Sequence, residues 1–236
     1  MFLKINMKRG EGMLEKIKKQ LIKPQMGRRI LMLLVAHVIM GFAVGMFNLV
    51  LLGNDPFSSL MKAITAKSGL SYGMVCAIMN TGFFLIEILW GRQYIGLGTI
   101  VNWFGLGYFV MMWNWILGNF VGQPENLILR VILSLAAVVV LGLSLSLYQS
   151  ADVGSAPFDS LPLVMKDKLN VPFFAGRIIC DGGALLLSLL LGGAKLGIGV
   201  CTVFVVVGLG PVANYFNKHV GAFLMEHQAF LSYAIE

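Results

Sequence analysis

One eight-residue stretch occurs twice in this chain, and the repeat that contains it constrains the fold more than any other sequence feature. Residues 53–60 read Gly-Asn-Asp-Pro-Phe-Ser-Ser-Leu and residues 154–161 read Gly-Ser-Ala-Pro-Phe-Asp-Ser-Leu, a spacing of 101 residues. Because glycine and proline fix backbone geometry rather than fill space, we interpret the chain as two copies of one unit. The same spacing relates further glycines: Gly41 and Gly142, Gly82 and Gly183, Gly96 and Gly197, Gly98 and Gly199, Gly107 and Gly208.

The composition predicts a membrane protein, with the lipid bilayer as its first partner. Hydrophobic residues make up 58% of the chain and charged residues 12%, whereas soluble proteins carry about 25% charged residues. So few charges cannot cover a soluble surface. Six apolar runs have the roughly 20 residues that cross the hydrocarbon of a bilayer: 30–52, 70–90, 97–117, 127–147, 171–191 and 198–215.

Each copy contains three of these runs, an odd number, so the second copy must cross the membrane in the opposite sense to the first. The positive charges test this independently, because cytoplasmic segments are enriched in Lys and Arg. With the N-terminus inside, 13 Lys and Arg fall on cytoplasmic segments and 3 on external segments. We therefore expect an all-α membrane protein with six transmembrane helices in a 3+3 inverted-topology repeat, both termini being cytoplasmic.

This topology divides the chain into five parts. The parts are a basic amphipathic cytoplasmic segment 1–29, a first three-helix repeat 30–117, a linker 118–126, a second, inverted three-helix repeat 127–218 and a cytoplasmic tail 219–236. Segment 1–29 holds nine of the 18 Lys and Arg, which we assign to orientation and to anionic lipid rather than to nucleic acid. This segment is expected to form a surface helix, with a partner-binding arm as the alternative.

Each copy of the motif is expected to begin a short helix after the first span of its half. Asp55 before Pro56 has the pattern of an N-cap followed by the first helical residue. In the second copy, Pro162 is expected to kink or restart the helix. About 12 residues cannot span a membrane. The short helices either lie flat at the interface or enter the protein with their N-termini at a central cavity, as in transporters with broken helices.

Ionisable residues inside apolar runs are functional hypotheses by default. Arg177 and Asp181 are four residues apart and share one helix face. They form an internal ion pair, an exchange site for a proton or counter-ion, or both. Glu87, three residues before Trp90, is expected to extend to the cytoplasmic interface, and His37 to bond to a neighbouring helix.

These observations define an expected site for a substrate or coupling ion and a set of structural hinges. No motif of a soluble enzyme and no metal-ligand spacing occurs in the sequence, so we expect no catalytic residue, metal or cofactor. The expected site residues are Asp181, Arg177, Asn80 (the repeat mate of Asp181), Asn54, Asp55, Ser58, Ser59, Ser155, Asp159, Ser160, Thr99 and Asn102. The expected hinges are Pro56, Pro157, Gly96, Gly98, Gly197 and Gly199.

The motif also resembles a known family. Gly-x-x-Pro-Phe-x-Ser-Leu after the first run, then Gly-x-Gly-Thr at 96–99 and Asn102, is similar to the YitT/YczE group of bacterial membrane proteins over residues 30–215. In that group an Asp often follows the aromatic residue; Asp159 keeps it, and Ser58 replaces it in the first copy. The resemblance implies an integral protein of a bacterial plasma membrane and a transporter, without a substrate.

We therefore expect a small secondary transporter that moves a small solute or ion through a central site between the two repeats. Proton coupling and a homodimer stay open. The alternatives are a non-transporting membrane partner or regulatory protein, and a channel. A polar pocket lined by both motifs would favour transport, and a sealed core with Asp181 fully paired to Arg177 would favour the partner.

Overall fold

The computed structural model of this protein describes residues 25–193 and 197–221, and every regular element within them is a helix. The all-α class expected from the sequence is confirmed. Most of the predicted segment 1–29, with its surface helix, and most of the predicted tail 219–236 lie outside the described residues. In chain order the elements are α2 (Met26–Val50), α3 (Pro56–Ser68), α4 (Tyr72–Trp90), η1 (Arg92–Tyr94), α5 (Leu97–Phe120), α6 (Leu127–Ser150), α7 (Pro157–Leu169), α8 (Phe173–Leu190), α9 (Val200–Phe216) and η3 (Asn217–Gly221).

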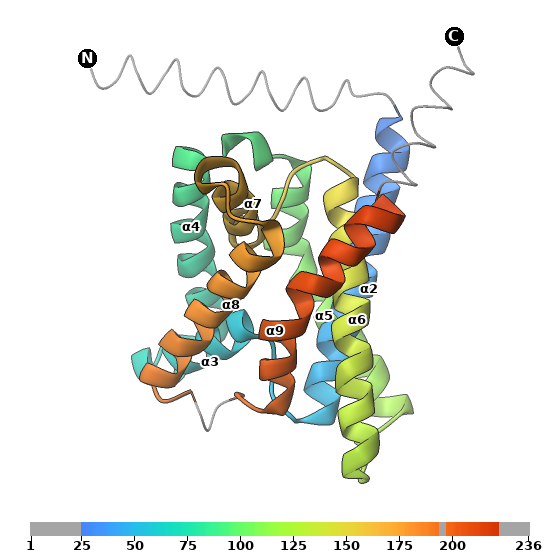
Figure 1. The fold of residues 1–236 in the computed structure, drawn as a ribbon. Helices are drawn as coiled ribbons and strands as arrows, with labels where there is room; N and C mark the ends of the chain where they lie inside the picture. The colour runs from blue at the N-terminus through green and yellow to red at the C-terminus, as the bar shows by residue number, and fades with distance from the viewer. Residues whose placement is uncertain (1–24, 194–196, 222–236) are drawn as a thin grey trace.

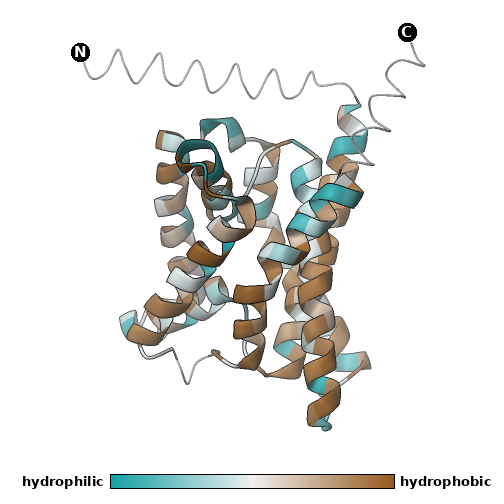
Figure 2. Cartoon of the chain, in the orientation of Figure 1, coloured by the Kyte–Doolittle hydropathy of each residue, from teal (hydrophilic) through white to brown (hydrophobic). Residues whose placement is uncertain are grey.

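Within the described residues, five helices are long and apolar enough to cross a membrane: α2, α5, α6, α8 and Val200–Val220, which joins α9 to most of η3. The remaining predicted span, 70–90, corresponds to α4, whose apolar stretch Met74–Trp90 is shorter. Figure 2 shows the long apolar stretches along these helices. Many of their large apolar side chains point outward, which is what lipid-facing helices require.

The helices pack as two bundles that do not correspond to the two sequence halves (Figure 1). In the first, the framework bundle, α2 packs on α5 and α6, and α6 packs on α9. In the second, the motif bundle, α3 and α7 pack on α4 and α8. Contact between α8 and α9 joins the bundles. Each bundle therefore combines helices from both copies of the repeat, and each has its own apolar core.

Two arginines show that α2 and α6 run antiparallel. Near the start of α2, Arg29 donates to the carbonyl oxygen of Ala151 just after the end of α6, at 2.9 Å. Near the start of α6, Arg130 donates to the carbonyl oxygen of Val50 at the end of α2, at 2.6 Å. Both donors and both acceptors are related by the 101-residue spacing. Each arginine places its positive charge against the free carbonyls of a helix C-terminus, which is the favourable end for a cation.

The helices of the framework bundle approach closely at glycines. A Cβ added at Gly41 on α2 would lie 2.8 Å from the Cβ of Phe109 on α5. A Cβ added at Gly142 on α6 would lie 2.5 Å from a methyl carbon of Val212 on α9. Small residues at such crossings let helix backbones come together inside a membrane.

The short helices begin as predicted. The Asp55 carboxylate accepts a hydrogen bond from the backbone nitrogen of Ser58 at 2.9 Å, and Pro56 is the first residue of α3. Of the predicted kink or restart at Pro162, the restart is wrong, because α7 continues through this residue. Gly176 on α8 faces this proline, and a Cβ there would lie 3.2 Å from the Pro162 Cα. A glycine on the neighbouring helix therefore makes room for the proline ring.

The loop before each short helix is hydrogen-bonded to the start of a long helix from the other copy. The Thr202 hydroxyl of α9 donates to the carbonyl oxygen of Asn54 at 2.7 Å. The Thr99 hydroxyl of α5 donates to the carbonyl oxygen of Ser155, also at 2.7 Å. Backbone bonds follow the same pattern: Asn54 to Gly197, Cys201 to Leu52, Ser155 to Tyr94 and Gly98 to Val153.

These bonds correct the expected register of the repeat. The two acceptors, Asn54 and Ser155, are 101 residues apart, whereas the two donors, Thr99 and Thr202, are 103 residues apart. The backbone nitrogens of Gly96 and Gly199 each bond to the threonine hydroxyl three residues later. Gly96 is therefore equivalent to Gly199, and not to Gly197 as the sequence spacing predicted. The two segments differ in length: residues 191–199 between α8 and α9 are nine, whereas residues 91–96 between α4 and α5 are six.

Candidate functional site

The two copies of the motif meet inside the motif bundle. The ring centroids of Phe57 on α3 and Phe158 on α7 are 4.8 Å apart, and Phe83 on α4 lies 5.4 Å from Phe158. Leu60 and Met61 of α3 are buried in the same core. The short helices therefore share one interior core, and their N-terminal turns come together. Of the two placements left open by the sequence, this packing matches helices that enter the protein.

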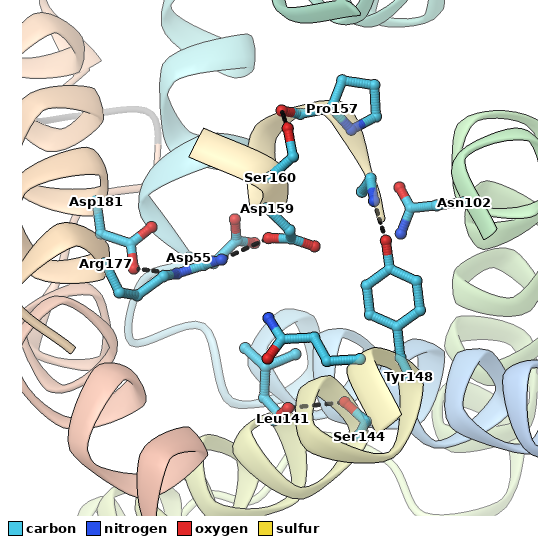
Figure 3. A network of polar contacts seen from close by, with 12 residues as sticks. Asp55, Asn102, Leu141, Ser144, Tyr148, Pro157, Asp159, Ser160, Arg177 and Asp181 are labelled. Atoms are coloured by element: carbon cyan, nitrogen blue, oxygen red, sulfur yellow. Dashed lines mark hydrogen bonds and ion pairs between the residues drawn. The ribbon is translucent and has the colours of Figure 1, made fainter. Parts of the chain in front are cut away.

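A charged triad lies where these N-terminal turns meet (Figure 3). Arg177 on α8 donates from Nε to the Asp181 carboxylate at 2.7 Å, across one helical turn as predicted. The same guanidinium forms an ion pair with Asp159, in the first turn of α7. Its carbon Cζ lies 5.5 Å from the ring centroid of Phe158, within the range of a cation–π contact. One arginine thus holds two carboxylates from two helices.

The triad carries more negative than positive charge. Asp181 is fully buried, and its Oδ1 has no hydrogen-bond partner among the described residues. Asp55, at the N-terminus of α3, adds a further negative charge that acts on Asp181 (Figure 3). An uncompensated charge is costly in a low-dielectric interior. A proton or a small cation would remove the excess.

The other predicted site residues fall into two groups. Asn54, Ser155 and Thr99 take part in the loop bonds already described. Ser59 donates to the Gly197 carbonyl oxygen at 3.0 Å, and Ser58 bonds through its backbone to Asp55. These residues hold the loops in place.

Three predicted residues have other surroundings. Ser160 donates to the Pro157 carbonyl oxygen at 2.9 Å. Asn102 donates to Nε2 of His37 at 3.4 Å, which confirms that His37 bonds to a neighbouring helix. Asn80 is half-buried on α4 and is not part of the triad.

A buried tyrosine that the sequence reasoning missed supports the second motif. Tyr148 on α6 is fully buried, and its hydroxyl accepts a hydrogen bond from the backbone nitrogen of Ala156, the N-cap of α7. The ring of His37 packs edge-on against it at 5.2 Å. The available signal was a tyrosine in an apolar run, since a buried tyrosine hydroxyl needs a partner.

The structure contradicts the predicted position of Glu87 at the cytoplasmic interface. The side chain is 0% exposed, and neither carboxyl oxygen has a hydrogen-bond partner among the described residues. The cause is α7, which covers the last turn of α4. A Cβ added at Gly91, the C-cap of α4, would lie 2.7 Å from a methyl group of Val164 on α7. The short helix therefore occupies the space that a side chain would need to reach water.

A smaller polar cluster ties η1 to the C-terminal turn of α7. The Tyr94 hydroxyl donates to the Asp167 carboxylate at 2.5 Å, and Gln93 donates to the same oxygen at 2.9 Å. The bond from Tyr94 lowers the pKa of Asp167, while partial burial raises the pKa of Tyr94.

Two further features lie outside this cluster. Burial lowers the pKa of Lys62 on α3. A hollow of about 420 Å³ is lined by Phe174, Pro211, Asn214, Tyr215, Lys218 and His219.

Comparison with known proteins finds relatives whose names carry no activity. The model of a family described as a family of unknown function, DUF6198, matches residues 27–218. An uncharacterized protein of Haemophilus influenzae is 26% identical over 191 residues, or 80% of this chain and 83% of that protein. The uncharacterized protein YyaS of Bacillus subtilis is 23% identical over 148 residues, or 63% of this chain and 73% of that protein. No solved structure matches.

Proposed function

Because this chain belongs to DUF6198, a family of unknown function, its activity has to be inferred from its own geometry, and we propose that it is a small secondary transporter. The observation that carries the proposal is the Arg177–Asp159–Asp181 triad at the meeting point of two proline-led helix N-termini. Discontinuous helices that meet near the middle of a membrane protein form the substrate and ion sites of many transporters.

The proposal includes the architecture expected from the sequence. It has six spans as a 3+3 inverted repeat, with α4 as the sixth span, in a bacterial plasma membrane with both termini cytoplasmic. The antiparallel arginine contacts of α2 and α6 and the exchanged loop bonds support inversion. The resemblance to the YitT/YczE group belongs to the same proposal.

The two bundles suggest how such a transporter moves. Asp159, Arg177 and Asp181 all belong to the motif bundle, as does Glu87. Side chains of the framework bundle supply no ionic partner to the triad among the described residues. We propose that the motif bundle shifts against the framework bundle as a unit, and that the hydrogen-bonded loops at α5 and α9 are the contacts that change. Rocking of one bundle against another is the usual form of alternating access.

The charges indicate the class of solute. Free N–H groups of helix N-termini and the guanidinium of Arg177 favour anions, but Arg177 is already paired with two carboxylates. What is left over is negative charge. The site therefore favours a small cation, or a solute that moves together with a proton.

One observation favours the alternative of a non-transporting membrane partner. Arg177 pairs with both aspartates, and Asp181 is sealed from solvent. Such a centre could serve stability or assembly alone. In the transporter reading, the same closure is the occluded state, in which neither face has access to the site. The two readings differ in whether the triad must change during function.

Flux measurement on the purified protein in liposomes tests the proposal. A panel of labelled small cations and metabolites is offered with and without an imposed pH gradient. We expect saturable uptake of at least one solute, its loss in Asp159→Asn and Asp181→Asn, and its retention in Glu125→Gln, an exposed carboxylate in the linker. If no solute is taken up and both aspartate variants support the same cell phenotype as the wild type, the transporter reading is wrong.

A further inference from the structure

Glu87 is the one buried acidic side chain in the described residues with neither oxygen bonded. It lies on α4, one turn before the end of the helix at Trp90. No lysine, arginine or histidine within the described residues forms an ion pair with it. The arrangement differs from that of Asp181, which shares its negative charge with Arg177.

The groups that face Glu87 make an additional negative charge unfavourable. Asp159 on α7 acts on it as a like charge, and Tyr148 on α6 is the other titratable group within electrostatic reach. The Ser160 hydroxyl lies beside it on α7 but gives its hydrogen to the Pro157 carbonyl. Neither α3 nor η1 contributes a charge to Glu87 in the described residues. A carboxylate in such a place would lack a counter-ion and would have the Ser160 hydroxyl as its hydrogen-bond donor, so burial favours the neutral acid.

The position of Glu87 allows exchange of that proton. Ser160 and Asp159 of α7, the latter a member of the triad, both act electrostatically on Glu87. Val164 of the same helix packs against Gly91, the C-cap of α4 one turn after Glu87. A shift of this short helix would open Glu87 to water, and its return would close the side chain against the triad.

We propose that Glu87 is a proton-binding site that exchanges its proton with water when α7 moves and holds it as a neutral acid when α7 is closed. In the open position the O–H bond of the acid breaks and the proton passes to water, which leaves a carboxylate exposed to water. In the reverse step the carboxylate takes a proton from water, so that the side chain is neutral again before α7 closes. The proposal deepens the proposed function, because it supplies the coupling proton of that transporter.

Infrared spectroscopy of the full-length protein in lipid tests the site without any transport assay. The carbonyl stretch of a protonated carboxyl group is separate from the bands of a carboxylate. Labelling with ¹³C-glutamate shifts this band for glutamate and leaves aspartate unaffected, so the unmodified protein can be measured. The variants are Glu87→Gln and, as matched control, Glu125→Gln, since Glu125 is the other glutamate in the described residues and is exposed.

At neutral pH we expect a protonated-glutamate band in the wild type and in Glu125→Gln, and its loss in Glu87→Gln. We also expect the band to fade reversibly as the pH is raised while the amide bands show that the protein stays folded. A band that does not shift on glutamate labelling, or that does not respond to pH until the protein unfolds, overturns the proposal. Glutamine mimics the neutral acid, so Glu87→Gln should fold at least as well as the wild type, and failure to fold also overturns it.

The flux experiment and the infrared experiment fail separately. If no solute shows flux but the protonated-glutamate band is present and titrates, the transporter proposal is wrong and the proton-site proposal stands. Saturable flux with no glutamate band keeps the transporter and assigns coupling to another group.

Discussion

Gly98 offers a sharp test of the loop bonds that join the two bundles, through the substitution Gly98→Ala. Gly98 is in the first turn of α5, where its backbone nitrogen donates to the Val153 carbonyl at 2.8 Å. A Cβ at this position would lie 2.2 Å from the carbonyl oxygen of Gly154. Contacts of a Cβ below 3.0 Å are essentially never seen, so the loop has to move away and the backbone bond has to stretch.

The magnitude follows from three opposing contributions. Overpacking costs about 1–3 kcal/mol and loss of the hydrogen bond about 0.5–1.5 kcal/mol. Alanine in place of glycine in a helix returns about 1 kcal/mol. The net destabilisation is about 2 kcal/mol, which lowers the thermal midpoint by about 4–8 °C in a chain of this size. Gly107→Ala in the same helix is the matched control, because a Cβ there meets nothing within 4 Å. It should raise the midpoint slightly.

Unfolding can be followed in detergent with a thiol-reactive fluorescent dye in a background without the partly exposed Cys76 and Cys180, because Cys201 is fully buried and becomes reactive only when the protein opens. Opposite signs for the two alanine variants support the close approach of α5 to the loop. If Gly98→Ala is as stable as Gly107→Ala, the exchanged bonds between the halves are not formed as described, and the case for two interlocked copies fails with them.

Two further predictions concern charges. Arg177→Met leaves the buried Asp181 and the partly buried Asp159 without their shared cation and should cost about 3–5 kcal/mol. The additional substitutions Asp159→Asn and Asp181→Asn should restore most of this stability. A triple variant no more stable than Arg177→Met, in the same dye assay, would refute the charge argument. The hydrogen bond from Tyr94 lowers the pKa of Asp167 in the folded protein. This bond therefore stabilises the fold fully above the pKa of an unfolded Asp, about 3.9, and the stabilisation is lost as the pH falls through the lower pKa of Asp167 in the folded protein. Asp167→Asn should remove this acid dependence of the thermal midpoint, and an unchanged profile between about pH 6 and pH 3 would contradict it.

The short helices show how far local sequence can predict structure. Both were expected from proline at the first helical position, and both run for 13 residues at the 101-residue spacing. The pairing of Arg177 with Asp181 was predictable because both residues lie one turn apart on one helix. Local patterns of this kind need no knowledge of which helices become neighbours.

The misplaced residues all depend on neighbours that are distant in sequence. Glu87 was expected at the interface because Trp90 follows it, but α7, some 70 residues later, covers that end of α4. The third member of the triad, Asp159, was named as a candidate, yet nothing in the sequence indicated that it would share Arg177 with Asp181. Tyr148 was missed for the same reason.

The all-α class, the long apolar helices, the doubled motif and the start of each short helix could be predicted from the sequence, because spacing, proline, glycine and hydropathy act over a few residues. Three features could not: the exchange of loop bonds with Thr99 equivalent to Thr202, the sorting of the helices into two mixed bundles, and the contact between the motif's two phenylalanines. They depend on packing in three dimensions, because burial and charge compensation belong to groups of helices. A carboxylate becomes a shared ion pair or an isolated acid according to what packs over it.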